Sequence, residues 1–216
     1  MDKENQSPSL LLGIDTGGTY TDGVLLDEAD RQVIATTKTL TTKHDLSECI
    51  SKALDELLPE DPRQIHLVSI STTLATNAIA EGKGRPVGLF LLGYDHDLVE
   101  KFSLDDHFAT SSYHFFTGGH TLHGEEQNPL GLPAILERAR ALEDKVEAFA
   151  VSGYFSPFNS SHEERSFEAL REALDHPVVL GHQLSSKLNS VQRAATATLN
   201  ASLISVIQEF VLAIRS

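Results

Sequence analysis

A ten-residue stretch near the N-terminus decides the fold: Gly13-Ile14-Asp15-Thr16-Gly17-Gly18-Thr19-Tyr20-Thr21-Asp22. An apolar run over 10–15 ends in this stretch, and a second apolar run over 20–27 begins in it, which predicts two strands joined by a glycine hairpin. A third run over 32–40 is rich in Val, Ile and Thr and follows a second short turn. Because both connections have hairpin length, we predict three antiparallel strands.

The hairpin has the chemistry of a phosphate-binding loop. Gly17 and Gly18 permit positive φ and a close backbone approach, and backbone N–H groups in such a turn form a nest for phosphate oxygens. The hydroxyls of Thr16, Thr19 and Thr21 add neutral donors. Asp15 does not bind phosphate directly but is suited to hold Mg²⁺. The alternative is an ordinary Gly-Gly hairpin, and the adjacent acid and hydroxyls favour the phosphate site over it.

The rest of the chain alternates helices and strands. The predicted helices cover 45–58, 73–81, 132–145, 161–175 and 188–214, and the predicted strands cover 65–70, 86–92, 146–152 and 177–180. The segment between 93 and 128 is less regular, and we predict that 71–128 is an inserted subdomain. This order predicts an α/β fold around a mixed sheet with flanking helices.

Composition excludes several classes of protein. The chain has 216 residues and a formal net charge of −14, which opposes general nucleic-acid binding and docking on an anionic membrane. Its single cysteine, Cys49, excludes a disulfide framework within the chain. No uninterrupted apolar run approaches about 18 residues, so we predict no membrane span. The polar residues 1–9 lack a signal-peptide core, so we expect a disordered tail and a cytoplasmic protein.

A second polar group follows the buried strand at 65–70. Thr72, Thr73 and Asn77 stand at its carboxyl end, where ligand sites form in α/β sheets, so we predict that they face a substrate. The alternative is a helix cap, because Ser71 or Thr72 is a good N-cap residue.

His120 follows a Gly118-Gly119 pair and is a candidate hydrogen-bonding group or general base. With His123, Glu125 and Glu126 it suggests a metal site, but ten histidines allow many chance pairs, and we favour a loop without a metal.

These motifs together resemble the N-terminal region of the hydantoinase/oxoprolinase family, of the hydantoin utilisation protein A type, in the actin-like ATPase and sugar-kinase superfamily. The resembling segments occur in family order: 13–22, Ser71-Thr72-Thr73-Leu74-Ala75-Thr76-Asn77-Ala78, Gly118-Gly119-His120, Pro129-Leu130, Ala150-Val151-Ser152, His162-Glu163 and Leu199-Asn200-Ala201. The resemblance implies an RNase-H-like lobe over 10–216.

The resemblance also implies a function. Members of the family phosphorylate the amide oxygen of a cyclic amide with ATP and then hydrolyse the activated ring, which implies ATP and Mg²⁺ as cofactors. A hydantoin, 5-oxoproline or related lactam is the expected substrate. Asp15, Thr73 and His120 are the candidate catalytic residues. Family members commonly work with a second chain, so the resemblance implies a partner subunit.

Full-length family members are longer, and their second ATPase lobe would follow position 216. The predicted helix at 188–214 has no glycine cap or trailing proline, so we expect the chain to be cut within it and to be inactive alone. Alternatives are a small-molecule kinase of the same superfamily, which transfers phosphate to a hydroxyl, and a non-catalytic ATP-gated module. An RNase-H-like nuclease shares the topology, but the acidic charge opposes it.

Overall fold

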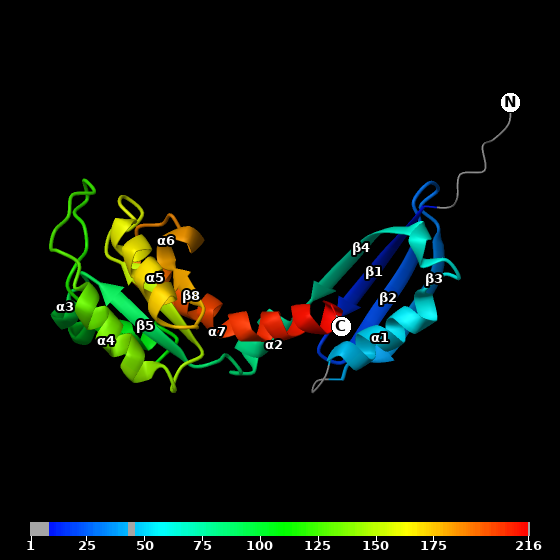
Figure 1. The fold of residues 1–216 in the computed structure, drawn as a ribbon, viewed down its shortest axis with the longest axis horizontal. Helices are drawn as coiled ribbons and strands as arrows, with labels where there is room; N and C mark the ends of the chain where they lie inside the picture. The colour runs from blue at the N-terminus through cyan, green and yellow to red at the C-terminus, as the bar shows by residue number, and fades with distance from the viewer. Residues whose placement is uncertain (1–8, 43–45, 216) are drawn as a thin grey trace, which may run out of the picture. The chain divides into compact units, whose positions relative to one another are not determined.

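The computed structural model describes residues 9–42 and 46–215, with side chains as far as residue 212. It divides into two compact units, which Figure 1 shows in ribbon form. Unit 1 comprises Met1–Gly82 and Val206–Ser216, and unit 2 comprises Lys83–Ser205. The second division falls within the last helix, so each unit is described by itself.

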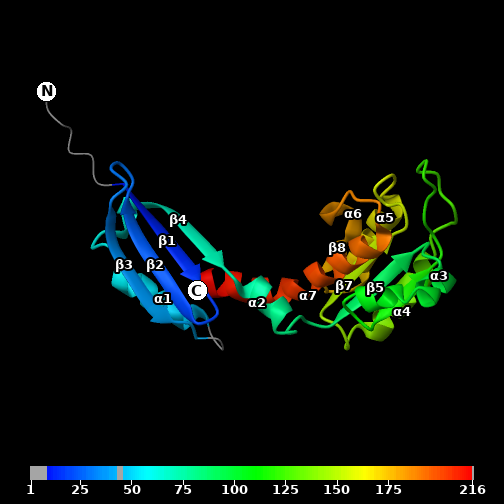
Figure 2. The same ribbon diagram turned by 180° about the vertical axis from the view of Figure 1, so that it is seen from behind.

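Unit 1 is built on a mixed sheet. Its strands are β1 (Leu10–Thr16), β2 (Tyr20–Asp27), β3 (Val33–Leu40) and β4 (Ile65–Thr72). They lie in the order β3-β2-β1-β4, which Figure 2 shows from behind. The first three strands are antiparallel neighbours, and β4 pairs with β1 in parallel. The three predicted N-terminal antiparallel strands are therefore confirmed.

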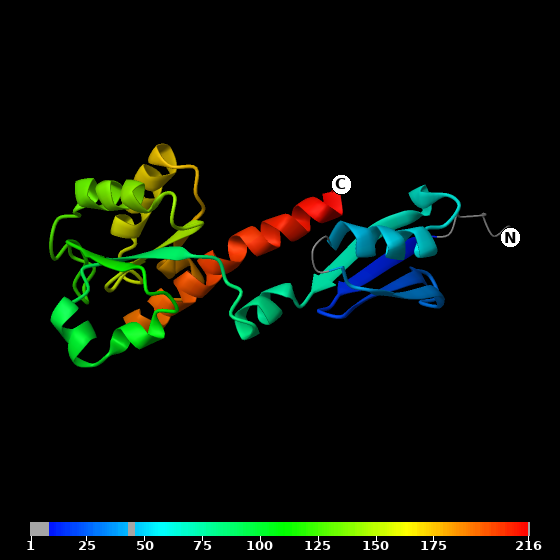
Figure 3. The same ribbon diagram turned by 90° about the horizontal axis from the view of Figure 1, so that it is seen from below.

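Helix α1 (Leu46–Leu57) covers one face of this sheet, as Figure 3 shows. Alternate residues of β1 turn their apolar side chains to that face and pack with the apolar side of α1 and with Phe210. Cys49 is buried in this core, where a free cysteine behaves as a small apolar residue. The predicted helix start at Asp45 lies outside the described residues. A short η1 (Pro62–Gln64) precedes β4, and α2 (Leu74–Ala80) follows it.

Unit 2 is built on a parallel sheet. Its strands are β5 (Val87–Leu92), β6 (Tyr113–Phe116), β7 (Ala148–Gly153) and β8 (Val178–Leu180), in the order β6-β5-β7-β8. Its helical segments are α3 (His96–Lys101), η2 (Leu104–His107), α4 (Leu132–Leu142), α5 (Ser161–Ala173), α6 (Gly181–Leu184) and the first part of α7 (Ser190–Arg215).

Both faces of the parallel sheet are covered. One apolar cluster joins β5 and β7 to α4 and α5 through residues such as Phe149 and Leu170. A second cluster joins the opposite face to α3, η2 and α7, where Ala194, Ala197 and Ala201 allow a close approach. Strands buried on both faces carry continuous apolar runs, which explains why all six residues of β5 are buried.

The predicted α/β fold class, a lobe of the actin-like ATPase type with a mixed sheet and flanking helices, is confirmed. The strands after β4 differ from the prediction, because they form a second sheet instead of extending the first. Part of the irregular segment is also ordered, as α3, η2 and β6. The inserted subdomain at 71–128 stays a prediction. Strands β5 and β6 lie within that range and pair in the same sheet as β7, which lies outside it.

Two predictions concern the ends of the chain. Of the predicted tail, residues 1–8 lie outside the described residues, and Ser9 donates a hydrogen bond to Glu28. At the other end, Ser190–Leu212 has the length and composition of a membrane span, although no uninterrupted apolar run is present. This is weak support for a span, because the segment also carries the buried Arg193 and contributes to the cores of both units.

Candidate functional site

The hairpin between β1 and β2 presents free backbone donors. The Gly17 N–H donates to the carbonyl oxygen of Tyr20 over 2.9 Å and closes the turn. Within the described part of the chain, the N–H groups of Gly18 and Thr19 make no hydrogen bond. These two groups at the tip are therefore available to an anionic ligand, as a phosphate nest requires.

The hairpin glycines serve close packing and not an unusual backbone conformation. Neither Gly17 nor Gly18 has a positive φ, in contrast to the expectation from the sequence. A Cβ at Gly17 would lie 3.0 Å from the Tyr20 carbonyl oxygen, and a Cβ at Gly18 would lie 2.8 Å from Nδ2 of Asn77. Gly17 thus lets the turn close on itself, and Gly18 lets its backbone approach Asn77 of α2.

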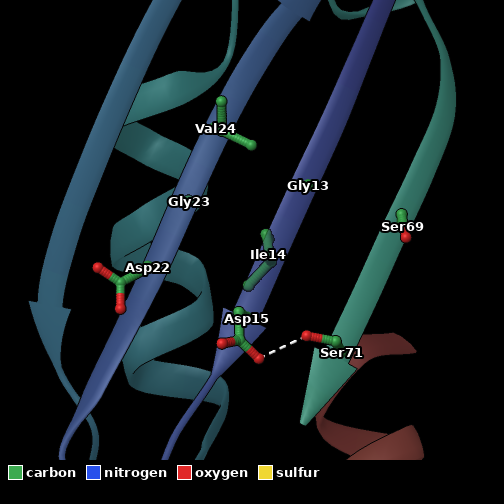
Figure 4. A pocket seen from close by; sticks show the side chains of 8 residues that line it. All are labelled: Gly13, Ile14, Asp15, Asp22, Gly23, Val24, Ser69 and Ser71. Carbon is green, nitrogen blue, oxygen red and sulfur yellow. Dashed lines mark hydrogen bonds between the residues drawn. The ribbon is translucent and has the colours of Figure 1, made fainter.

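Asp15 lies on the sheet face opposite α1, in a shallow pocket of about 270 Å³ that Figure 4 shows. The pocket is lined by residues of β1, β2 and β4: Gly13, Ile14, Asp15, Asp22, Gly23, Val24, Ser69 and Ser71. Ser71 Oγ donates to Asp15 Oδ1 over 2.5 Å, so one carboxylate oxygen is held in place. The bond fixes the carboxylate beside the hairpin and leaves Oδ2 for a ligand.

A row of polar side chains crosses the open face at this level. The strand register places Lys38, Asp22, Asp15 and Ser71 side by side on β3, β2, β1 and β4. Lys38 Nζ contacts Asp22 Oδ1 at 2.9 Å. Asp15 has no such cation among the described residues, although it lies opposite Asp22. Two carboxylates on facing positions repel each other, and a cation between them would relieve that repulsion.

This donor set fits Mg²⁺ bound together with a phosphate. Among the described residues, no group of three His, Cys, Asp or Glu side chains is arranged to hold a metal by itself. Mg²⁺ does not need such a cage, because it commonly keeps several waters and binds through one or two carboxylates plus substrate phosphates. Asp15 would supply one ligand, directly or through water.

The three threonines of the hairpin do not share one environment. Thr16 and Thr21 are fully buried on the α1 side, and only the side chain of Thr19 is exposed. Thr21 Oγ1 bonds to Thr41 Oγ1 and donates to Cys49 Sγ. Thr16 Oγ1 has no hydrogen-bond partner among the described residues. Thr16 is buried because side chains alternate along β1: Thr16 follows the exposed Asp15 and therefore points to the other face of the sheet.

The predicted substrate residues lie against the same hairpin. Thr72 Oγ1 donates to the Thr16 carbonyl oxygen at 3.0 Å and accepts the Leu74 N–H at 3.1 Å. The N-cap residue of α2 is Thr73, and Thr72, one position earlier, bonds to the backbone on both sides of it. Asn77 Nδ2 donates to Thr73 Oγ1 at 3.1 Å and lies beside Gly18. Thr73 and Asn77 thus remain at the edge of the turn, where a ligand would meet them.

His120 belongs to unit 2 and is only 2% exposed. Its ring packs on that of His162 with centroids 4.3 Å apart, and burial together with the neighbouring His162 lowers the pKa of His120. Glu126 accepts from His162 Nε2 at 2.7 Å, because His162 Nδ1 already accepts the Gly119 N–H. His120 and Glu126 are therefore parts of a packed polar cluster.

Sequence analysis gave no site role to three polar residues of the Asp15 pocket: Asp22, Ser69 and Ser71. Asp22 was within the quoted motif but had no assigned role. Ser69 and Ser71 alternate along β4, which is the signal for side chains on one face. Their position opposite Gly13 and Asp15 depends on the register between β1 and β4, which the sequence does not reveal.

Comparison with known proteins gives the chain a family. Residues 11–174 match the profile of the hydantoinase/oxoprolinase N-terminal region. The chain belongs to this family. Among curated proteins, it is 31% identical over 226 residues to the caprolactamase subunit alpha of Pseudomonas jessenii. It is 27% identical over 236 residues to the acetophenone carboxylase gamma subunit of Aromatoleum aromaticum.

Solved structures share the fold of this hydantoinase/oxoprolinase chain. The ATP-dependent caprolactamase from Pseudomonas jessenii superposes with a TM-score of 0.75 at 28% identity, covering 95% of this chain and 33% of that one. A nucleotide-free acetone carboxylase superposes with a TM-score of 0.75 at 18% identity, covering 96% of this chain and 34% of that one. Coverage of the two curated relatives is 93% and 91% of this chain but 32% and 31% of theirs, so the chain spans about a third of their length.

Proposed function

We propose that the chain is the ATP-binding first lobe of an enzyme that opens a cyclic amide, such as a hydantoin, 5-oxoproline or another lactam, by ATP-dependent hydrolysis. The observation that carries the proposal is the position of Asp15, which Ser71 orients at the carboxyl end of β1 beside a hairpin with two free N–H groups. The similarity to an ATP-dependent caprolactamase supports the choice of substrate class.

The proposed reaction does not require a covalent intermediate with a protein side chain. A lactam carbonyl is a poor electrophile, and transfer of the terminal phosphoryl group of ATP to its oxygen makes that oxygen a leaving group for attack by water. Catalysis is then largely positioning and charge stabilisation. In the proposal, Gly18 and Thr19 bind phosphate oxygens through their N–H groups, and Asp15 holds Mg²⁺. Thr73 and Asn77 contact the substrate.

In the proposal, three of the predicted site residues take a supporting role. Thr16, Thr21 and Thr72 would support the hairpin from behind rather than touch a ligand, since the first two are buried and the third is engaged by two backbone groups. Phosphate contacts therefore fall to the backbone of the turn. A second lobe and a partner subunit would complete the site, because both curated relatives are named as subunits and are about three times longer.

The test uses the complete enzyme that contains this chain. Asp15→Asn is expected to lower lactam-stimulated ATP hydrolysis by about 100-fold, the usual effect of losing one charge-stabilising group. Asp55→Asn, on the exposed side of α1, is the matched control and should retain activity. Normal ATP hydrolysis by Asp15→Asn would contradict the proposal.

The carboxylase relative makes a ketone-activating enzyme the second candidate. Both reactions activate a carbonyl oxygen, so the hairpin would serve either one. A panel of hydantoins, 5-oxoproline, caprolactam and acetophenone with bicarbonate separates them by which compound stimulates ATP hydrolysis. A stable phosphorylated product would instead indicate a small-molecule kinase, and nucleotide binding without stimulated turnover would indicate an ATP-gated module.

A further inference from the structure

Unit 2 has a polar pocket that the proposed ATP site does not use. Its volume is about 370 Å³, and its polar lining comes from Ser156, Asn159, Ser160, His182 and Ser186. These residues follow the carboxyl ends of β7 and β8 and flank the start of α5, which Figure 1 labels. The carboxyl ends of adjacent parallel strands are where α/β sheets bind ligands.

A buried carboxylate orients the histidine of this pocket. Glu163 is 0% exposed and accepts three hydrogen bonds: from the Gly153 N–H at 2.6 Å, from the His182 N–H at 2.9 Å and from His182 Nδ1 at 2.6 Å. Because Nδ1 must carry its proton to donate to Glu163, Nε2 is the ring atom left for the pocket. The hydrogen bond to Glu163 raises the pKa of His182, which favours the imidazolium.

The buried charges around His182 have a positive balance. Arg193 on α7 is 1% exposed and donates to the carbonyl oxygens of Lys187 and Gly153, both at 2.8 Å. Arg193 and Glu163 both pack against Gly181, at the start of α6. The two positive charges of Arg193 and protonated His182 thus outnumber the single negative charge of Glu163.

The remaining charge at the pocket is Glu164, which behaves as an internal ligand. Its Oε1 accepts from Ser160 Oγ at 2.7 Å and lies 3.7 Å from His182 Nε2. The Glu164 side chain is 55% exposed, so it can leave this position without disturbing the core. A carboxylate therefore already lies near the free nitrogen of His182.

Ser156 is an independent sign of a missing partner. The residue lines the pocket and is 3% exposed, yet its Oγ has no hydrogen-bond partner among the described residues. A buried hydroxyl without a partner is unfavourable, and each such group in a native structure calls for an explanation. The N-terminal end of α5 adds a partial positive charge on the same side.

We propose that this pocket binds a small oxyanion, a carboxylate or phosphate group, between His182 Nε2 and the first turn of α5, in place of the Glu164 carboxylate. The site is one of binding and not of nucleophilic attack, because Ser156 Oγ makes no hydrogen bond to His182, the base that would have to activate it. It lies within unit 2 and does not rest on the function proposed for the Asp15 hairpin.

The test is a titration of the 216-residue chain with inorganic phosphate and, separately, with acetate, at constant ionic strength and about pH 6, where His182 is charged. The His182 ring resonances are followed by NMR, and they are expected to shift in a saturable way. Glu164→Gln should bind the preferred anion at least about threefold more tightly, because the competing carboxylate is gone. Phosphate binding tighter than acetate binding identifies a phosphate site, and the reverse identifies a carboxylate site.

The controls keep the result specific. His182→Gln should abolish binding measured by calorimetry, whereas His123→Gln, in an exposed loop of the same unit, should not change it. Circular dichroism checks that each variant is folded. No saturable shift in either the parent chain or Glu164→Gln overturns the proposal, as does an affinity that Glu164→Gln or a folded His182→Gln leaves unchanged.

Discussion

Asp15 and Asp22 occupy facing positions on β1 and β2, and like charges so placed weaken a sheet. We therefore expect Asp15→Asn to leave the free energy of unfolding unchanged or to raise it by about 0.5 kcal/mol. The amide oxygen of the variant side chain would still accept the hydrogen bond from Ser71. Urea denaturation of the 216-residue chain measures the change.

The control for this prediction is Asp22→Asn, which removes the same repulsion but also the ion pair with Lys38. Its free energy of unfolding should therefore rise less than that of Asp15→Asn. A loss of more than about 1 kcal/mol in Asp15→Asn would show that Asp15 supports the fold, in conflict with a functional role. A stable variant without activity separates chemistry from folding.

His182 gives the stability a defined pH dependence. Its pKa is raised above the ordinary 6.5 by the hydrogen bond to Glu163, so the folded state binds the proton more tightly than the unfolded state. The stability that His182 gains from this tighter proton binding is present in full below pH 6.5. It is lost as the pH rises through the higher pKa of the folded state. Thermal unfolding at a series of pH values should show His182→Gln losing most stability on the acid side. An equal loss at every pH would contradict the prediction.

Sequence analysis predicted Asp15 and the hairpin but not the direction of each side chain. Leu10, Leu12 and Ile14 alternate along β1, so the same period places Thr16 with the core. That signal was available in the sequence. The partners of Glu163 and His182 were not, because they come from separate elements that only the folded sheet brings together.

At the scale of elements, strong periodicity made most predictions accurate. The helix expected over 45–58 is α1 at Leu46–Leu57, and the strand expected over 86–92 is β5 at Val87–Leu92. The elements missed between 93 and 128 are short, with six residues in α3 and four in β6. Segments of one turn or four residues carry too few positions to establish a period, and tertiary contacts decide their structure.

Gly93, just after β5, combines a positive φ with close contacts to backbone atoms. Its φ is +71°, and a Cβ would lie 2.6 Å from both the Gly118 carbonyl oxygen and Gly119 Cα. We expect Gly93→Ala to destabilise unit 2 by about 3 kcal/mol, from backbone strain and from displacement of the Gly118-Gly119 loop. Thermal or urea unfolding measures this loss.

Gly124 provides the matched control in the same unit. Its φ is +77°, but the nearest atom to a new Cβ is 3.2 Å away. Gly124→Ala should therefore cost about 1–2 kcal/mol, mostly backbone strain. Equal losses of unfolding free energy in the two variants would show that the contact between Gly93 and Gly118-Gly119 does not contribute to stability.

For the whole molecule, the alternation of helices and strands predicted the α/β fold class but not the number of sheets. Whether β5 pairs with β4 or with β7 depends on long-range contacts, and a helix-strand order is compatible with both. Residues 83–86 begin unit 2. The two apolar clusters on the faces of β5 and β7 pack this sheet against helices of the same unit. The second sheet follows from that packing.

This division predicts that residues 83–205 fold alone. The segment contains a complete four-stranded sheet, an apolar cluster on each face and the α7 residues that complete one of them, so excision exposes little of its core. Residues 1–82 lack Phe210, which is 6% exposed in the core against α1, so that segment should be less stable. The expected results are a cooperative thermal transition for 83–205 and amide NMR peaks that coincide with those of the 216-residue chain. A collapsed segment with no dispersed peaks would mean that the core of unit 2 depends on unit 1.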